Sequence, residues 1–471
     1  MRLSVLTSAA ALLALAACVE SNPVTSTNPP SELRYSLSPA ATSDVIPGQY
    51  LVMFRKNEIP VSFAAEVATR GGSVRASHGK VGIAVVSGLD DAAATALAGR
   101  PDVELVSPDE LFNVDPIDQV VVAQAPADQI ASPAAPATAF FYARQWNMRA
   151  VSANTAWSAG KLGSASVTVA ILDTGIDYDN FDLNGLVDLS RSTSFLPDED
   201  AFLSSIFPGK HVITDLHYHG THVASTVVSK AFVTAAVSSR TTLIGVKVCN
   251  RNGSCPSSAV LAGVIYATDQ GADVMNLSLG GAFDRKASKA AKDFAKFIDR
   301  TFKYAYKNGT LAVVAAGNEA TDLDANGTIY KTYCDSPNVV CVSATGPTAS
   351  AGVNGPWANI DASAFYTNYG RAINVAAPGG NTGGAVWAAC SHYSVVIPIC
   401  QTGIFTLGAA GTSMAAPHVS GLAALIAAQN KHKPKDIRKQ LERSADDLGA
   451  PGTDPFYGKG RINVARALGL N

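Results

Sequence analysis

The sequence predicts an α/β fold of three layers, in which a mainly parallel sheet lies between two layers of helices. Five short runs are almost continuously apolar, as strands covered on both faces must be. These runs are 167–172, 243–248, 274–279, 311–315 and 339–343. Helical patterns at 257–270 and 287–307 supply the crossovers that parallel strands need. Charged residues make up only 16% of the chain, and its 39 glycines suit close packing of helices on a sheet.

The chain begins with a segment typical of export signals. Met1-Arg2 precedes an apolar stretch, 3–17, that is too short for a membrane-spanning helix and ends in small residues. Leu15-Ala-Ala-Cys18 resembles a bacterial lipobox. The resemblance implies that residues 1–17 are a signal peptide, that Cys18 is lipidated, and that the chain is anchored at the outer membrane or cell surface. The alternative is a cleaved signal in which Cys18 is incidental.

The rest of the chain divides into four parts. Residues 18–46 are rich in Ser, Thr, Pro and Asn and predict a flexible tether. Residues 47–115 predict a small α+β unit of ferredoxin-like type, and 116–139 an Ala-, Pro- and Gln-containing linker. The three-layer domain then occupies 140–471. Within the small unit we expect strands near 50–55, 80–86 and 103–106, and helices near 61–69 and 91–98.

Three polar residues stand where predicted strands end or helices begin. Asp173 follows the first strand in the turn D-T-G-I-D, and His219 opens the helical segment H-G-T-H-V-A. Ser413, in G-T-S-M-A-A-P-H, precedes an apolar helix at 419–428. The start of a helix offers free N–H groups and the positive end of the helix dipole, which suits a nucleophile that forms an oxyanion.

In this order the three segments resemble the signature segments of the subtilisin-like serine proteases. The resemblance implies that Asp173 orients the base, His219 is the general base and Ser413 is the nucleophile. The order Asp, His, Ser differs from that of the α/β-hydrolases, and no Gly-x-Ser-x-Gly surrounds Ser413. An esterase or lipase is therefore disfavoured.

Two further segments resemble binding elements of the same family. A-A-G-N-E at 315–319 is similar to the oxyanion-hole motif, so Asn318 would donate its side-chain amide to the tetrahedral intermediate. The segment 274–281 resembles the strand that pairs with bound substrate. The resemblance implies that the walls of the substrate site include Ser278, Leu279, Gly280, Gly317 and Glu319.

The spacing of His217, His219 and His222 allows an alternative, because imidazole is a common metal ligand. The segment lacks the Glu of the zinc peptidase motif, so we interpret His222 as structural and His217 as a neighbour of the active site. The resemblance requires no cofactor for catalysis. It allows structural Ca²⁺, for which the sequence identifies no ligands.

Of the seven cysteines, six remain when Cys18 is set aside, and they lie in three local groups without C-x-x-C spacing. Export favours disulfides. Proximity, which leaves other connectivities open, predicts the pairs Cys249 with Cys255, Cys334 with Cys341, and Cys390 with Cys400.

The sequence thus predicts a serine endopeptidase of broad specificity that acts on proteins or peptides. A net charge of -2 and the lack of a basic run give no case for nucleic acid. The alternative is a lipid-anchored, peptide-binding pseudoprotease. Residues 47–115 resemble an inhibitor-type propeptide, which implies an intramolecular inhibitor and folding template, cleaved off between Asn113 and Thr138 so that the protease can leave the anchor. The alternative here is a permanent N-terminal domain.

Overall fold

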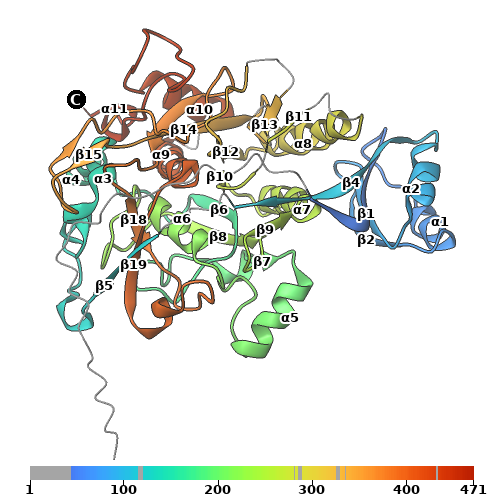
Figure 1. Ribbon diagram of the computed structural model, residues 1–471, viewed down its shortest axis with the longest axis horizontal. Coiled ribbons are helices and arrows are strands. Elements are labelled where there is room, and N and C mark those ends of the chain that lie inside the picture. Colours follow the sequence, from blue (N-terminus) through green and yellow to red (C-terminus); the bar gives the residue numbers. More distant parts are fainter. Residues whose placement is uncertain are drawn as a thin grey trace, which may run out of the picture. The chain divides into compact units, whose positions relative to one another are not determined.

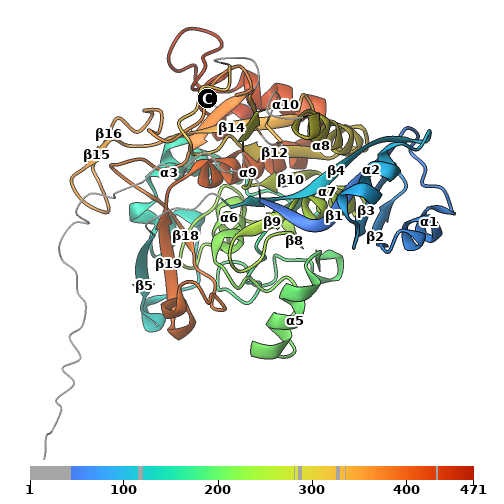
Figure 2. The ribbon, with the colours of Figure 1, turned by 45° about the vertical axis from the view of Figure 1, so that its right-hand side comes forward.

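The structure is a computed structural model (Figures 1 and 2). It describes residues 44–114, 120–280, 282–284, 289–324, 329–331, 333–334, 336–430 and 433–470. The predicted signal peptide, Cys18 and nearly all of the predicted tether lie outside these residues. Within the described ranges, no helix has both the length and the apolar character needed to cross a membrane.

The core of the molecule is a seven-stranded parallel sheet, in the order β17-β14-β12-β10-β6-β8-β7. Its strands are β6 (Thr168–Asp173), β7 (Thr193–Ser194), β8 (Thr242–Lys247), β10 (Val274–Leu277), β12 (Leu311–Ala315), β14 (Val339–Thr345) and β17 (Val375–Pro378). The strands that follow β6 in the sequence, β7 and β8, lie on one side of it. The later strands β10, β12, β14 and β17 lie on the other side, in that order. The order therefore reverses between β6 and β10, which is where open α/β sheets form their sites.

Helices cover both faces of this sheet, which confirms the predicted three-layer fold. Helices α6 (His219–Val227) and α9 (Thr412–Asn430) pack on one face, and α7 (Ser257–Asp269) and α8 (Lys289–Lys307) on the other. Alternate residues of β6 serve the two layers, because successive side chains of a strand point to opposite faces. Val169 and Ile171 pack with α6 and α9, whereas Ala170 and Leu172 pack with α7 and α8.

Residues 44–113 form a separate antiparallel sheet with two helices. The order of elements is β1 (Asp44–Phe54), α1 (Phe63–Thr69), β2 (Ser73–His78), β3 (Ile83–Ser87), α2 (Asp91–Ala98) and β4 (Val103–Asn113). The sheet order β2-β3-β1-β4 is the ferredoxin-like arrangement. The sequence did not predict β2, whose side chains alternate between half-buried and exposed without an apolar period, and β4 extends well beyond the predicted strand.

This small unit packs on the α7 and α8 layer of the large domain. Leu51, Met53 and Leu105 share an apolar cluster with residues of both helices. Arg300 of α8 donates hydrogen bonds to the carbonyl oxygen of Phe54, over 2.6 Å, and to the Glu104 carboxylate. At its end, β4 pairs with β9 (Ser254–Pro256).

Part of the predicted linker is also a strand. β5 (Val121–Ala125) pairs with β19 (Ile404–Ala409), which pairs in turn with β18 (Val386–Ala389), and all three strands are antiparallel. In both ribbon views β5 and β9 lie on different sides of α6 (Figures 1 and 2). The remaining helices and strands are α3 (Trp146–Ala150), α4 (Ala153–Ser158), α5 (Pro197–Ile206), α10 (Pro434–Arg443), α11 (Val464–Ala467), β11 (Ala282–Asp284), β13 (Ile329–Lys331), β15 (Ala349–Ser350) and β16 (Trp357–Ala358).

Three disulfides join the same pairs that proximity in the sequence predicts. They link Cys249 to Cys255, Cys334 to Cys341, and Cys390 to Cys400. All six cysteines are buried. The bridges therefore belong to the packed parts of the domain, and Cys341 lies within β14 of the central sheet.

Candidate active site

The topology brings the expected site residues to one edge of the sheet. Asp173 is the last residue of β6, Ser278 follows β10 directly, and Asn318 lies just beyond β12. These strands are parallel neighbours, so their carboxyl ends meet at the same edge. This edge is also where the strand order reverses.

Asp173 and His219 form a buried pair. His219 Nδ1 lies 2.8 Å from Asp173 Oδ1, which also accepts a hydrogen bond from the backbone N–H of Thr174 over 2.7 Å. Both side chains are almost completely buried. A carboxylate at Nδ1 fixes that nitrogen as the donor, and so directs Nε2 away from Asp173 as the proton acceptor.

Gly220 allows α6 to begin this close to β6. A Cβ atom at Gly220 would lie 2.1 Å from the carbonyl oxygen of Gly175, so any side chain here would push the helix away. The backbone N–H of Gly220 also donates to Thr174 Oγ1 over 2.9 Å. The turn after β6 and the first turn of α6 are thus locked together, with Asp173 and His219 between them.

Ser413 lies inside the first turn of α9, because this helix begins at Thr412 rather than at the predicted residue 419. Ser413 Oγ donates to the carbonyl oxygen of Ser278 over 3.0 Å, and Ser278 Oγ donates to that of Ser413 over 2.8 Å. This reciprocal pair joins the start of α9 to the end of β10. The hydroxyl expected to act as nucleophile therefore lies against the segment expected to bind substrate.

Thr412 fixes the orientation of Asn318, and sequence reasoning missed this residue. Asn318 Oδ1 accepts hydrogen bonds from Thr412 N (2.8 Å) and Thr412 Oγ1 (3.0 Å). Thr412 Oγ1 accepts in turn from the backbone N–H of Gly317 over 2.8 Å. Because two donors hold Oδ1, the amide nitrogen of Asn318 must point away from Thr412.

Asn368 holds the loop that carries Asn318, and it too was not predicted. Its Oδ1 accepts from the backbone N–H groups of Glu319 and Thr321, while its Nδ2 donates to the carbonyl oxygen of Ala316 and to the Glu319 carboxylate. Gly317 has φ 97°, a left-handed conformation that favours glycine. The turn after β12 is therefore shaped by a buried amide at one end and by Thr412 at the other.

The end of β4 lies between β9, which the sequence did not predict as part of the site, and the segment expected to bind substrate. Asn113 pairs antiparallel with Ser254 on one side and forms a bridge with Gly280 on the other. The backbone N–H of Val114 donates to the carbonyl oxygen of Gly253 over 2.8 Å. Leu279 is buried in the same apolar cluster as Val114. Residues of the small unit thus form a central extended strand between the 253–254 segment and Gly280. The space that this strand fills is called the groove below.

Val114 also lies beside His217. A Cβ built on Gly253 would meet Val114 Cγ2 at 2.8 Å and His217 Nε2 at 3.8 Å, so these side chains approach the same point. Burial, followed by the charge of His219, lowers the pKa of His217 to about 3, so its ring is neutral near pH 7. The uncharged imidazole of His217 therefore lies beside the groove, close to Val114.

The three neighbouring histidines do not form a metal site. Among the residues that the structure describes, no group of three or more His, Cys, Asp or Glu side chains is placed to hold a metal ion. His222 Nε2 lies 3.1 Å from the carbonyl oxygen of Leu407 and 3.2 Å from that of Val386. Burial lowers the pKa of His222 to about 4, which suits a neutral structural ring.

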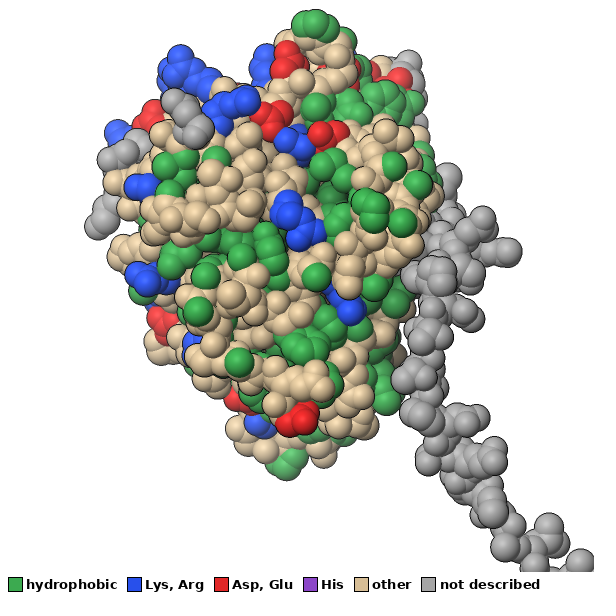
Figure 3. All heavy atoms as spheres, turned by 90° about the vertical axis from the view of Figure 1, so that its left-hand side faces the viewer, with side chains coloured by type: hydrophobic (Ala, Val, Ile, Leu, Met, Phe, Trp, Pro, Cys, Tyr) green, Lys and Arg blue, Asp and Glu red, His purple; other side chains and the backbone are tan. Residues whose placement is uncertain are grey.

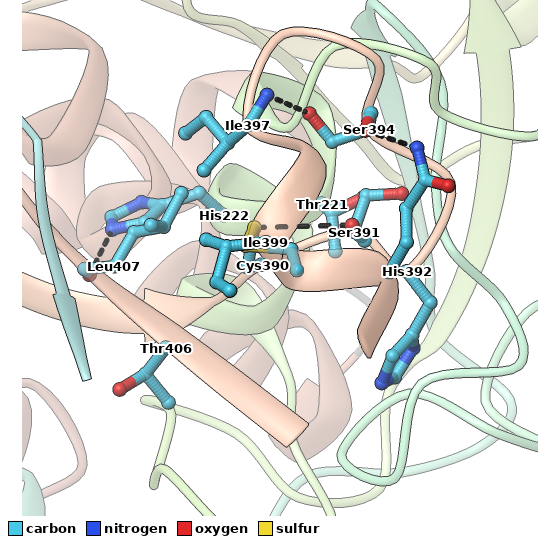
Figure 4. Close-up of a disulfide and its surroundings, with 12 residues drawn as sticks. Thr221, His222, Cys390, Ser391, His392, Ser394, Ile397, Ile399, Thr406 and Leu407 are labelled. Atoms are coloured by element: carbon cyan, nitrogen blue, oxygen red, sulfur yellow. Dashed lines mark hydrogen bonds between the residues drawn. A yellow bond between two sulfur atoms is a disulfide. The ribbon is translucent and has the colours of Figure 1, made fainter. Parts of the chain in front are cut away.

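Figure 4 shows the surroundings of the Cys390–Cys400 disulfide, which closes a loop. This loop also braces the segment before His219. Three consecutive carbonyl groups of that segment accept hydrogen bonds from the loop. The pairs are Asp215 with Ser391 Oγ (2.6 Å), Leu216 with Val395 N (2.9 Å) and His217 with Ser394 Oγ. Tyr218 packs against both cysteines and Leu407. The position of His219 thus depends on a loop far away in the sequence.

The same loop carries an ionic contact to the turn after β6. His392 Nδ1 lies 2.7 Å from Asp177 Oδ2, and the backbone N–H of His392 donates to the same oxygen over 2.8 Å. Burial lowers the pKa of His392, but the hydrogen bond and charge of Asp177, with the charge of Asp179, outweigh it and raise the pKa overall. The raised pKa favours the protonated form of His392, and in that form its charge ties the loop to the turn that follows Asp173.

This geometry defines a class of protein: a doubly wound α/β domain with a buried carboxylate–imidazole pair, a serine at a helix start and an asparagine at the adjacent strand end. The family model described as the subtilase family matches residues 164–460, more than half of the 471-residue chain. The chain belongs to this family of peptidases and is a serine-type endopeptidase.

Individual relatives agree with this assignment. The chain is 29% identical to the thermophilic serine proteinase of Bacillus sp. (strain AK1) over 381 residues, which cover 80% of this chain and 76% of that protein. It is 33% identical to subtilisin DY of Bacillus licheniformis over 307 residues, covering 64% and 91%. The fold is similar to that of the epidermin leader peptide processing serine protease of Staphylococcus aureus, with a TM-score of 0.66, 20% identity, and 89% and 97% coverage.

Proposed function

We propose that this peptidase cleaves protein substrates with Ser413 as nucleophile, His219 as general base, Asp173 as the carboxylate that orients the base, and Asn318 as an oxyanion donor. The observation that carries the proposal is the 2.8 Å contact between Asp173 and His219. It lies at the sheet edge where the chain also presents Ser413 and Asn318.

Each residue has a defined part in the proposed reaction. His219 Nε2 takes the proton of Ser413 as Oγ attacks the substrate carbonyl carbon, and Asp173 stabilises the resulting imidazolium. The amide nitrogen of Asn318 and the backbone N–H of Ser413 donate to the oxyanion. His219 then protonates the leaving amine, and water releases the acyl group by the same steps. These residues supply every proton transfer, so we propose that catalysis needs no metal; calcium would be structural.

Extended main-chain pairing supports broad specificity. Asn113 lies between Ser254 and Gly280 through backbone pairing, which does not depend on the identity of the side chain. We propose that substrate residues upstream of the cleaved bond bind in the same way, against walls that include Ser278 to Gly280 and Gly317 to Glu319. Val114 and His217 mark the pocket for one of those side chains.

We further propose that residues 47–115 are a propeptide that inhibits the enzyme by occupying this groove. The support is the path of Phe112, Asn113 and Val114, which enter the groove as an extended strand while the rest of the small unit packs on α7 and α8. Such a partner can also serve as a folding template, because a parallel sheet must close many non-local contacts. Cleavage between Asn113 and Thr138 would free the groove.

Export and lipid anchoring at Cys18 complete the proposal. Three disulfides fit an oxidising compartment outside the cytoplasm. In this arrangement the lipid stays on the propeptide, and cleavage separates the peptidase domain from the membrane.

The test is the intact mass of the wild type beside Ser413→Ala, together with casein digestion. We expect the wild type to lose the propeptide and digest casein, and Ser413→Ala to stay full-length and inactive. If both keep residues 47–138 in one chain while the wild type digests casein, the propeptide proposal is wrong. If the folded wild type binds peptides without digesting any protein, the pseudoprotease alternative replaces the peptidase mechanism.

A further inference from the structure

β5 occupies the edge of β19 next to the active site. The two strands pair antiparallel over five residues, from Val121 opposite Gly408 to Ala125 opposite Ile404. β18 covers the other edge of β19. Without β5, this edge would present unpaired N–H and C=O groups, which readily accept another extended strand.

The direction of β5 matches a polypeptide that leaves the active site. β19 runs toward α9 and Ser413, so its antiparallel partner β5 runs away from Ser413. Val120, just before β5, packs against the cluster that contains Tyr218, the residue before His219. Val114, where the described upstream strand ends, lies beside His217. The described residues on either side of 115–119 thus lie near His217 and Tyr218, the two residues that precede His219.

β5 is held mainly through its backbone. Its side chains alternate, with Val122 and Gln124 exposed, Val121 and Ala123 half-buried and Ala125 buried. Ala125 packs in a small cluster with Phe141, Val233 and Ile404. Two alanines and one half-buried valine bury little apolar area, so little is lost when these side chains leave. Any extended segment could replace the main-chain hydrogen bonds.

We propose that the β19 edge is the subsite for substrate residues downstream of the cleaved bond, and that β5 is a resident strand that substrates must displace. This inference rests on the proposed peptidase function. It predicts a preference for unfolded segments that continue for about ten residues beyond the cleaved bond, with small side chains at the two positions that Ala123 and Ala125 fill. The side of the molecule on which β5 lies in Figure 1 carries mostly uncharged side chains with scattered charged ones (Figure 3), which suits such a segment.

If cleavage falls between Asn113 and Val121, β5 remains attached to the processed enzyme as part of its N-terminal arm. A tethered strand competes at an effective concentration on the order of millimolar, so it can slow the binding of long substrates without blocking short ones. The arm would inhibit only the downstream half of the site. This separates it from the propeptide, which occupies the upstream half.

The test compares two substrates on the processed enzyme, both wild type and variants. One is a tetrapeptide p-nitroanilide, which has no residues downstream; the other has the same tetrapeptide followed by ten residues and a quencher. Ala125→Asp places a charge in the buried position and should expel β5, whereas Gln124→Asp adds the same charge at an exposed position and is the matched control. We expect Ala125→Asp to raise kcat/KM for the long substrate by about tenfold relative to the short one, as removal of a tethered competitor would. Gln124→Asp should leave the ratio unchanged.

An equal ratio in wild type and Ala125→Asp would overturn the inference, while failure of the wild type to cleave either substrate would instead overturn the proposed function. If Ala125→Asp does not fold, amide exchange in the wild type decides. The processed enzyme is inactivated with a fluorophosphonate, and a peptide made of the ten downstream residues is added. Faster exchange at Val121–Ala125 would support displacement of β5, and unchanged exchange at saturating peptide would contradict it.

Discussion

The two strands that flank the active site are held in different ways. The upstream strand, Phe112 to Val114, belongs to a folded unit whose sheet packs on α7 and α8 and whose edges carry charged contacts such as Arg300 with Glu104. The downstream strand, β5, is a single strand whose inward-facing residues are Val121 and two alanines. If the two proposals hold, one chain carries a strong inhibitor on one side of its site and a weak, displaceable one on the other.

Loss of the nucleophile should have the largest effect on turnover, because no acyl-enzyme can form without it. The uncleaved chain would also keep both strands in place. We expect Ser413→Ala and His219→Ala each to lower kcat by about 10⁶-fold, a magnitude measured for subtilisin itself. Neither variant should process itself. Residual rates of casein hydrolysis, measured after inhibition of contaminating proteases, check this. Near wild-type turnover in folded Ser413→Ala would remove the triad assignment.

Asn318→Ala should have the next largest effect, and should act on turnover rather than binding. The expected loss in kcat is about 10²- to 10³-fold, again the range known for the equivalent donor in subtilisin, with little change in KM. Thr412→Val removes the hydroxyl that holds Asn318 Oδ1 and should give a smaller loss in the same parameter. A kinetically silent Asn318→Ala would remove the oxyanion assignment.

A substitution at the propeptide interface should weaken inhibition through the upstream strand and leave the downstream strand unaffected. Arg300→Ala removes hydrogen bonds to Phe54 and Glu104. We expect inhibition by the separated propeptide to weaken by about tenfold, the scale of a partly buried charged hydrogen bond. Arg371→Ala, whose side chain is 84% exposed, is the control and should leave inhibition unchanged. Equal inhibition constants for Arg300→Ala and wild type would show that the charged contact contributes nothing.

The pH dependence of stability tests the loop beside the downstream strand. Because the pKa of His392 is raised above its unfolded value, its pairing with Asp177 stabilises the fold fully below about pH 6.5 and loses this effect as pH rises through the folded pKa. The neighbouring Asp179, Lys210 and Tyr393 keep their mutual contacts. His392→Gln should therefore lower Tm at pH 5.5 more than at pH 9. An equal shift at both values would contradict a charged pair.

Much of the fold could be predicted because its signals are local. The five apolar runs correspond to β6, β8, β10, β12 and β14, and the helical patterns to α7 and α8. A buried strand or an amphipathic helix can be recognised from the apolar pattern of consecutive residues. The missed strands include β2, β5, β17, β18 and β19. β2 and β5 are partly exposed, and β17 and β18 are only four residues long, so they lack such a period.

The site shows the same limit. Motifs indicated Asp173 and His219, and the structure brings them together. The residues that hold the site in place were not predicted, because their contacts join distant parts of the chain. Thr412 and Asn318 are 94 residues apart, and Ser391 and Asp215 are 176 apart. No sequence window contains both partners.

Labelling with a fluorophosphonate, followed by peptide mapping, tests the central claim most directly. The reagent phosphonylates only a serine that has a base to take its proton and donors for the developing oxyanion. We predict one modified residue in the processed wild type, Ser413, and no labelling in His219→Ala or in a sample saturated with added propeptide. Modification of another serine, or equal labelling of Ser413 in folded His219→Ala, would contradict the proposed mechanism.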